Sequence, residues 1–193
     1  MTSFTIENLR YKASANQQVE DAISYYQSPE KRRIALRKAL AASPDDARLH
    51  QYRLRLTSPK LVAQAMASGV FLSYSRADEL FVIELADHLR EVGVQVWLDM
   101  MDIETDFDWN FAVQSALTNC GLMIAVLSPA ALKDEAARSE RRTFFEAGKL
   151  VQPVVARRCD LKDVDFWLSP IDFSRDYTVG LHSLLRALSI EVF

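Results

Sequence analysis

The amino-acid sequence predicts an α/β fold, in which a parallel sheet carries helices on both faces and follows a separate helical segment. Three observations lead to this prediction. From residue 69 onward, short apolar runs alternate with longer segments whose apolar residues recur at helical spacing. Residues 69–99 alone make one complete strand-helix-strand unit of about thirty residues. The first of these runs, Val70 to Leu72, is uninterrupted, as in a strand buried on both faces. Such sheets place their chemistry at the carboxyl ends of their strands.

The first of these units can be followed element by element. A strand is expected at residues 70–72, before the polar loop 73–77. A helix then begins near Asp78, which is a suitable capping residue, and stops at Gly93. A second strand is expected within residues 94–99. The residues that repeat at helical spacing are Phe81, Leu85, Ala86 and Leu89.

The alternation of strands and helices continues to the end of the chain. The expected elements are a helix over 109–119, a strand over 122–127, a helix from Ser128-Pro129 to Ala147, strands over 151–156 and 171–173, and a helix over 180–188. Five parallel strands with helices on both faces form a doubly wound, flavodoxin-like sheet with right-handed connections. The strand order expected for a sheet of this size is 2-1-3-4-5.

Residues 1–68 are predicted to be all-helical and separate from the α/β domain, which we place at residues 69–193. The pairs Ser28-Pro29, Ser43-Pro44 and Ser58-Pro59 lie fifteen residues apart, and each offers a capping serine with proline at the first helical position. Short helices bury little surface by themselves. We therefore expect this segment to pack on the main domain or on another chain.

Composition excludes several classes of protein. Residues 1–68 hold five more basic than acidic residues, whereas residues 69–193 hold eight more acidic than basic ones. A modestly basic segment beside an acidic body is more typical of protein docking than of a DNA-binding surface. Because no aromatic residues interleave with the basic ones, we expect no nucleic-acid partner.

The sequence also gives no sign of a membrane protein. The longest apolar run is too short to span a bilayer and the start does not resemble a signal peptide, so we expect a cytoplasmic protein without a membrane contact. The three histidines and two cysteines lack metal-ligand spacing, so no metal site is assigned.

Glu140 is the most informative single residue. On a helix after Pro129, its carboxylate would lie in the middle of an apolar stripe. A carboxylate in that place needs a partner, a raised pKa or an open cleft in front of it. A structural, hydrogen-bonded glutamate and a functional one both satisfy this pattern, and the helix's place beside the carboxyl edge of the sheet favours function. The other members of the stripe would be Ala136, Ala137, Thr143, Phe144 and Ala147.

Several segments, in the right order and spacing, resemble a Toll/interleukin-1 receptor (TIR) domain of the bacterial type. They cover roughly residues 69–190 and read VFLSYSRAD, VWLD, a tryptophan at position 109, AVLSPAAL, GKLVQPVV and IDFS. Many bacterial, plant and neuronal TIR domains cleave NAD between nicotinamide and ribose, with a glutamate on the helix after the third strand. Glu140, eight residues before Gly148, matches that glutamate. The resemblance therefore implies an NAD glycohydrolase or ADP-ribosyl cyclase that uses NAD as substrate and needs no cofactor.

The resemblance also implies a set of substrate-binding residues. Tyr74, Ser75 and Arg76 match the loop that lines the nucleotide pocket, and Asp99 ends the second strand at the same edge. Trp109 matches an aromatic residue that stacks near nicotinamide, although a core position at the start of its helix fits equally well. Ser128 can touch the ribose or cap its helix, and capping is favoured.

Two positions depart from the family pattern. Enzymatic members often carry a tryptophan where Ala136 stands, and a glycine is usual where Asp106 stands. Both departures favour activity that depends on self-association or on a partner, through the TIR domain or the front helices. We expect such partners to include other TIR or sensor proteins, in bacterial defence or signalling. The alternative is a TIR scaffold that binds other TIR domains without catalysis.

Two other classes with related topology do not fit the sequence. A phosphoacceptor receiver domain needs an aspartate at the end of the third strand, where Ser128 stands, and an acidic pair after the first strand. A dinucleotide-binding dehydrogenase needs a GxGxxG loop after the first strand, and the sequence has none there.

Overall fold

The computed structural model describes residues 29–98, 109–161 and 168–190. By their internal contacts, the residues divide into two compact units, Met1–Leu56 and Thr57–Phe193, and each is considered by itself.

The described part of the first unit is a pair of helices, α2 (Pro29–Ala42) and α3 (Ala47–Leu56). Arg33 is buried between them and donates hydrogen bonds to the carbonyl oxygen of Leu56 at 3.2 Å and to Glu30 at 3.4 Å. Burial lowers the pKa of Arg33 to about 10, although the charge of Glu30 opposes this shift. The buried guanidinium therefore holds the end of α3 against α2.

Two of the three helix starts expected at Ser-Pro pairs are confirmed. α2 begins at Pro29 and α4 (Pro59–Met66) at Pro59. The start expected at Ser43-Pro44 is wrong, because the amide of Ser43 still donates to Ala39 at the end of α2. Asp46 takes over instead, and its carboxylate accepts the amide of Leu49 at 3.3 Å.

The predicted sheet is confirmed. Its five parallel strands lie in the order β2-β1-β3-β4-β5. Every residue of the two long central strands is buried, because helices cover both faces of the sheet. The bounds are β1 Val70–Ser73, β2 Val96–Trp97, β3 Leu122–Leu127, β4 Leu150–Val155 and β5 Ile171–Asp172.

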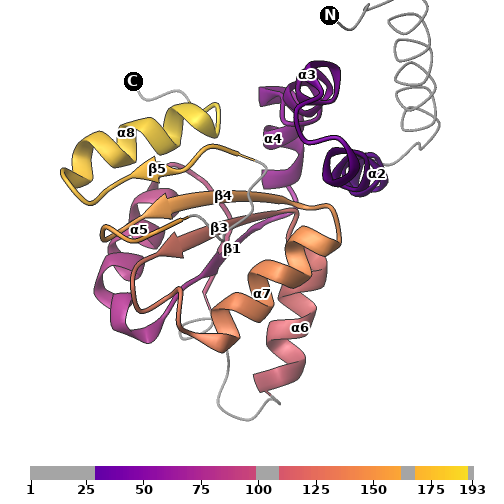
Figure 1. The fold of residues 1–193 in the computed structure, drawn as a ribbon. Coiled ribbons are helices and arrows are strands. Elements are labelled where there is room, and N and C mark those ends of the chain that lie inside the picture. Colours follow the sequence, from indigo (N-terminus) through magenta and orange to yellow (C-terminus); the bar gives the residue numbers. More distant parts are fainter. Residues whose placement is uncertain (1–28, 99–108, 162–167, 191–193) are drawn as a thin grey trace, which may run out of the picture. The chain divides into compact units, whose positions relative to one another are not determined.

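Figure 1 shows α5 (Glu79–Glu91) and α8 (Tyr177–Ala187) on one face of the sheet, with α6 (Trp109–Asn119) and α7 (Glu135–Glu146) on the other. A short 3₁₀ turn, η1 (Arg76–Asp78), leads from β1 into α5. This arrangement is the doubly wound one, and it brings the ends of β1, β3 and β4 to a common edge.

The helix expected from Ser128-Pro129 begins later than predicted. The Ser128 hydroxyl accepts the amide of Ala131 at 3.0 Å, and its carbonyl accepts the amide of Leu132 at 3.0 Å, so residues 129–133 close as a turn. α7 itself starts at Glu135, where the Asp134 carboxylate caps it by accepting the amide of Ala137 at 3.1 Å. Its expected stop is confirmed, since Gly148 has a φ of 69°, which favours glycine.

α4 belongs to the second unit, together with the sheet, and not to the front segment 1–68 in which it was expected. A side chain at Gly121, just before β3, would place its Cβ 2.3 Å from the carbonyl oxygen of Ala65 in α4. The absence of a side chain at Gly121 thus allows α4 to approach the sheet this closely.

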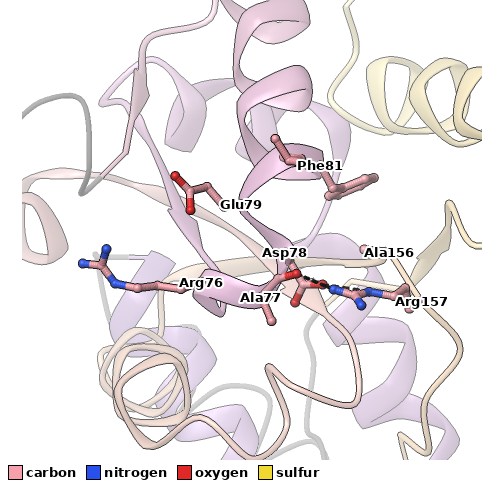
Figure 2. A pocket seen from close by; sticks show the side chains of 8 residues that line it. Arg76, Ala77, Asp78, Glu79, Phe81, Ala156 and Arg157 are labelled. Carbon is pink, nitrogen blue, oxygen red and sulfur yellow. Dashed lines mark hydrogen bonds and ion pairs between the residues drawn. The ribbon is translucent and has the colours of Figure 1, made fainter.

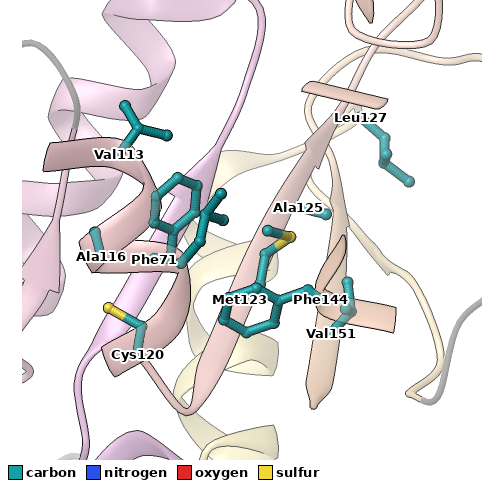
Figure 3. Packing of buried hydrophobic residues seen from close by; sticks show 10 residues of the cluster. Phe71, Val113, Ala116, Cys120, Met123, Ala125, Leu127, Phe144 and Val151 are labelled. Atoms are coloured by element: carbon teal, nitrogen blue, oxygen red, sulfur yellow. The ribbon is translucent and has the colours of Figure 1, made fainter. Parts of the chain in front are cut away.

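The core beneath α6 and α7 is a cluster of apolar side chains centred on Phe71, Met123 and Phe144 (Figure 3). Phe71 stacks on Trp97 with ring centroids 4.9 Å apart, and it lies 6.3 Å from the ring of Phe144. Cys120 is buried in the same cluster, and both cysteines are free thiols. On the opposite face, the rings of Phe81, Phe173 and Tyr177 pack edge to face between α5 and α8.

Lys149 fastens the end of α6 to the start of β4. Its ammonium donates to the carbonyl oxygens of Leu117 at 2.8 Å, Thr118 at 2.6 Å and Cys120 at 2.9 Å. These are the carbonyls that a helix leaves unsatisfied at its carboxyl end, where a positive charge is also favourable.

Replacing Lys149 with methionine is expected to lower the free energy of unfolding by about 1.5–3 kcal/mol, the range typical of hydrogen bonds to charged groups. Urea unfolding followed by circular dichroism measures this loss. The matched control is Lys133→Met, at an exposed position, with an expected change within about 0.5 kcal/mol. Equal losses in the two variants would show that the three carbonyl contacts contribute no stability.

Candidate functional site

The carboxyl edge of the sheet holds a paired serine and glutamate. Ser73, the last residue of β1, is fully buried, and its hydroxyl donates to the Glu140 carboxylate on α7 at 2.8 Å. The carbonyl oxygen of Ala137 lies 3.4 Å from the same hydroxyl. The hydroxyl therefore orients the carboxylate toward the end of β1. Ser73 was expected in the polar loop and without a role. It is in fact the last residue of β1 and the polar residue of an otherwise apolar strand, and this position is the signal that could have identified it.

Glu140 lies at the rim of the buried face of α7, and the expectation that it lies in the middle of an apolar stripe is wrong. The buried residues of this helix are Ala137, Arg141 and Phe144, whereas Glu140 is half-buried. The face turned to the sheet is thus rotated away from the one expected, because a buried arginine takes part in it. The expected stripe members that are exposed are Ala136, Thr143 and Ala147.

Arg141 brings a buried positive charge close to this carboxylate. It is 8% exposed, and its Nη2 atom donates to the carbonyl oxygen of Ala131 at 3.2 Å. Within the described residues, its Nη1 atom has no hydrogen-bond partner. Burial lowers the pKa of Arg141, and the neighbouring Glu140 charge acts in the opposite direction. Because a buried charge is screened less than one in water, the guanidinium interacts more strongly with the Glu140 carboxylate than an exposed arginine would.

The loop after β1 carries three of the predicted substrate-binding residues. Tyr74 is half-buried, Ser75 is buried and Arg76 is exposed at the start of η1. The carbonyl of Ser75 accepts the amide of Asp78 at 2.7 Å, which closes the turn. Tyr74 and Ser75 follow Ser73 directly, so the chain itself places them next to the Ser73–Glu140 pair.

Asp78 was expected to cap α5, but it makes no capping hydrogen bond. Its carboxylate instead accepts the hydroxyl of Ser128 at 2.5 Å and the guanidinium of Arg157, whose Nε atom lies at 3.0 Å (Figure 2). The Ser128 hydroxyl is therefore occupied twice, by Asp78 and by the amide of Ala131. Ser128 therefore closes the turn that precedes α7, and the helix cap expected of it is provided by Asp134 instead.

An open cleft of about 450 Å³ lies beside this network (Figure 2). Glu140 is not among its lining residues, so the cleft is separate from the Ser73–Glu140 pair. The cleft is lined by residues 76–81 together with Ala156 and Arg157.

Several of the remaining predicted residues cannot be compared with the structure. Asp99 and Asp106 lie outside the described residues, and so does the side chain of Trp109, the first residue of α6. Within the described ranges, no group of three or more histidine, cysteine, aspartate or glutamate residues could hold a metal ion. In the same part of the chain, every helix is too short or too polar to cross a bilayer.

The protein is thus a doubly wound parallel α/β domain. It holds a half-buried carboxylate at the carboxyl edge of the sheet, where domains of this class bind their ligands. Residues 70–185 match the family model described as the TIR domain, so the chain belongs to the TIR domain family. Among solved structures, it is similar to the TIR domain of the Toll-related receptor TRR-2 from Hydra magnipapillata. That match has 19% identity and a TM-score of 0.52, and it covers 62% of this chain and 97% of the other. It shows the shared fold. No curated protein matches the chain.

Proposed function

We propose that this TIR domain is an enzyme that cleaves NAD at the bond between nicotinamide and ribose. The observation that carries the proposal is the hydrogen bond of 2.8 Å between Ser73 and Glu140, which holds a half-buried carboxylate at the carboxyl edge of the sheet. A carboxylate fixed in this way keeps its orientation during a reaction, so it contributes electrostatic stabilisation without reorganisation.

Cleavage of the bond between nicotinamide and ribose requires chiefly a negative charge near the ribose, which this carboxylate provides. When the cationic nicotinamide departs, positive charge develops on the ribose, as in glycoside cleavage generally. Glu140 stabilises that charge and accepts hydrogen bonds from the ribose hydroxyls. Water then attacks to give ADP-ribose, or the adenine of the same molecule attacks to give a cyclic product.

The rest of the substrate is assigned to the neighbouring loop and helix start. Tyr74 and Ser75 border the ribose, and Arg76 meets a phosphate through its forked donors. By the resemblance alone, Asp99 and Trp109 are proposed to bind the substrate as well, Trp109 as the aromatic residue for the nicotinamide ring. Ser128 is left out of this set, because Asp78 and Ala131 already occupy its hydroxyl.

We place this activity in the cytoplasm, in a defence or signalling module that self-association switches on. The experiment that tests the enzymatic proposal follows free nicotinamide by chromatography while NAD is incubated with the full chain over a range of protein concentrations. Release that rises more steeply than protein concentration supports an enzyme activated by assembly. A chain that releases no nicotinamide at any concentration would refute the proposal.

One observation favours the alternative, a scaffold that binds other TIR proteins without catalysis. Leu80, in the first turn of α5, is 85% exposed beside the exposed Arg76 and half-buried Glu79. Leu80 also lines the open cleft beside Asp78 and Arg157, so a partner protein that fills this cleft would remove the side chain from water. The test measures self-association by light scattering. The scaffold is the better description if the wild-type chain self-associates without cleaving NAD and Leu80→Asp abolishes the self-association.

A further inference from the structure

Arg157 ties together three segments at the carboxyl edge of the sheet. It follows β4, and its Nε atom donates to the Asp78 carboxylate at 3.0 Å. Its Nη2 atom donates to the same carboxylate and also to the carbonyl oxygen of Ala77 at 2.5 Å. From the other side, Ser128 at the end of β3 donates to Asp78 at 2.5 Å. One carboxylate thus joins the ends of β3 and β4 to the loop after β1.

This network anchors the far end of a short loop. The near end is Ser73, which contacts Glu140, and the far end is Asp78, which contacts Arg157 and Ser128. Residues 74–77 between them include Tyr74, Ser75 and Arg76, the residues proposed to bind NAD. Their positions therefore depend on two side-chain anchors, one at each end of the loop.

The charges explain why the far anchor depends on Arg157. The side chain of Asp78 is only 1% exposed, whereas that of Arg157 is 57% exposed. A buried carboxylate without a cationic partner is unfavourable, so it moves toward water when the partner is removed. Because Asp78 lies at the end of the loop, this movement would carry residues 74–77 with it. Figure 2 shows Arg157 reaching Asp78 while Arg76 points away from both.

We propose that Arg157 is a positioning residue for NAD: by holding Asp78 and Ala77, it keeps the loop 74–77 in the shape that presents its side chains to the substrate. This inference rests on the proposed function. Arg157 is assigned no contact with NAD, and it acts through Asp78. Its planar guanidinium suits the task, since it donates to a carboxylate and a carbonyl at once, which a lysine ammonium does with less fixed geometry.

The first test compares the kinetics of NAD cleavage by the wild-type chain, Arg157→Lys and Arg157→Met. The inference predicts that Arg157→Met raises KM for NAD about tenfold while kcat changes little, because the loop binds the substrate and Glu140 remains in place. Arg157→Lys should fall between the two. The matched control is Arg158→Met, at the exposed neighbouring position, and it should behave as the wild type does. A merely structural role would reduce the amount of folded enzyme and leave KM unchanged, which would overturn the inference.

The second test needs no catalysis. Hydrogen exchange of backbone amides, followed by mass spectrometry, should become about tenfold faster in residues 74–78 of Arg157→Met, with β3 and β4 unchanged. Unchanged exchange in the loop overturns the role of Arg157 even if the enzyme is active. A wild-type chain that releases no nicotinamide overturns the proposed function, and the link between Arg157 and NAD falls with it. The two failures are therefore distinguishable.

Discussion

Replacing Glu140 with glutamine is expected to reduce nicotinamide release from NAD by at least about 100-fold, in line with the loss of one preorganised electrostatic group. Glutamine has nearly the same shape, and its carbonyl oxygen can still accept the hydroxyl of Ser73. What it lacks is the negative charge that stabilises the developing cation on the ribose. The measurement is the initial rate of nicotinamide release at saturating NAD, by chromatography.

The matched control for this prediction lies on the same helix. Glu135 is exposed in the first turn of α7, so Glu135→Gln should leave the rate within about twofold of the wild type. Both variants should unfold at nearly the wild-type temperature, because neither loses buried apolar contacts. If folded Glu140→Gln kept more than about a tenth of the activity, the charge of this residue would not be the source of catalysis.

Replacing Phe144 with alanine is expected to lower the free energy of unfolding by about 3–5 kcal/mol, as for other phenylalanines removed from a packed core. Phe144 is fully buried between α7 and the sheet, its ring 6.3 Å from that of Phe71. The ammonium of Lys149 also lies 4.9 Å from its ring centroid, a favourable cation–π distance. Urea unfolding measures the loss directly.

The control for Phe144 is an apolar residue that the fold leaves in water. Val179, in the first turn of α8, is 62% exposed, so Val179→Ala should change stability by less than about 0.5 kcal/mol. A loss for Phe144→Ala as small as that of the control would mean that the core beneath α6 and α7 is not packed as described.

The fold was predictable because its signals are local. The strand β3 is an uninterrupted apolar run, β4 carries a single polar residue, Gln152, and 2-1-3-4-5 is a common order for five parallel strands. The start of α7 was not predictable in the same way. Ser128-Pro129 is a good helix start locally, but Ser128 also bonds to Asp78, fifty residues away in sequence, and the turn after it closes before the helix begins.

The candidate site could be predicted only where a family pattern or a helix position pointed to it. Glu140 was predicted to be functional in this way. Its place at the rim of the buried face was not predicted, because helical geometry alone did not indicate that Arg141 would be buried. The contacts of Ser73 with Glu140 and of Arg157 with Asp78 join residues 67 and 79 positions apart. No local pattern records such contacts, since they arise only when the sheet brings its strand ends together.

The most direct test of the account is a crystal structure of the chain with an NAD analogue whose nicotinamide bond cannot be cleaved. The account predicts that the ribose next to nicotinamide lies against Glu140, with its hydroxyls within hydrogen-bond distance of the carboxylate, and that Arg76 contacts a phosphate. An analogue bound elsewhere, such as in the cleft between Phe81 and Arg157 with Glu140 untouched, would contradict it.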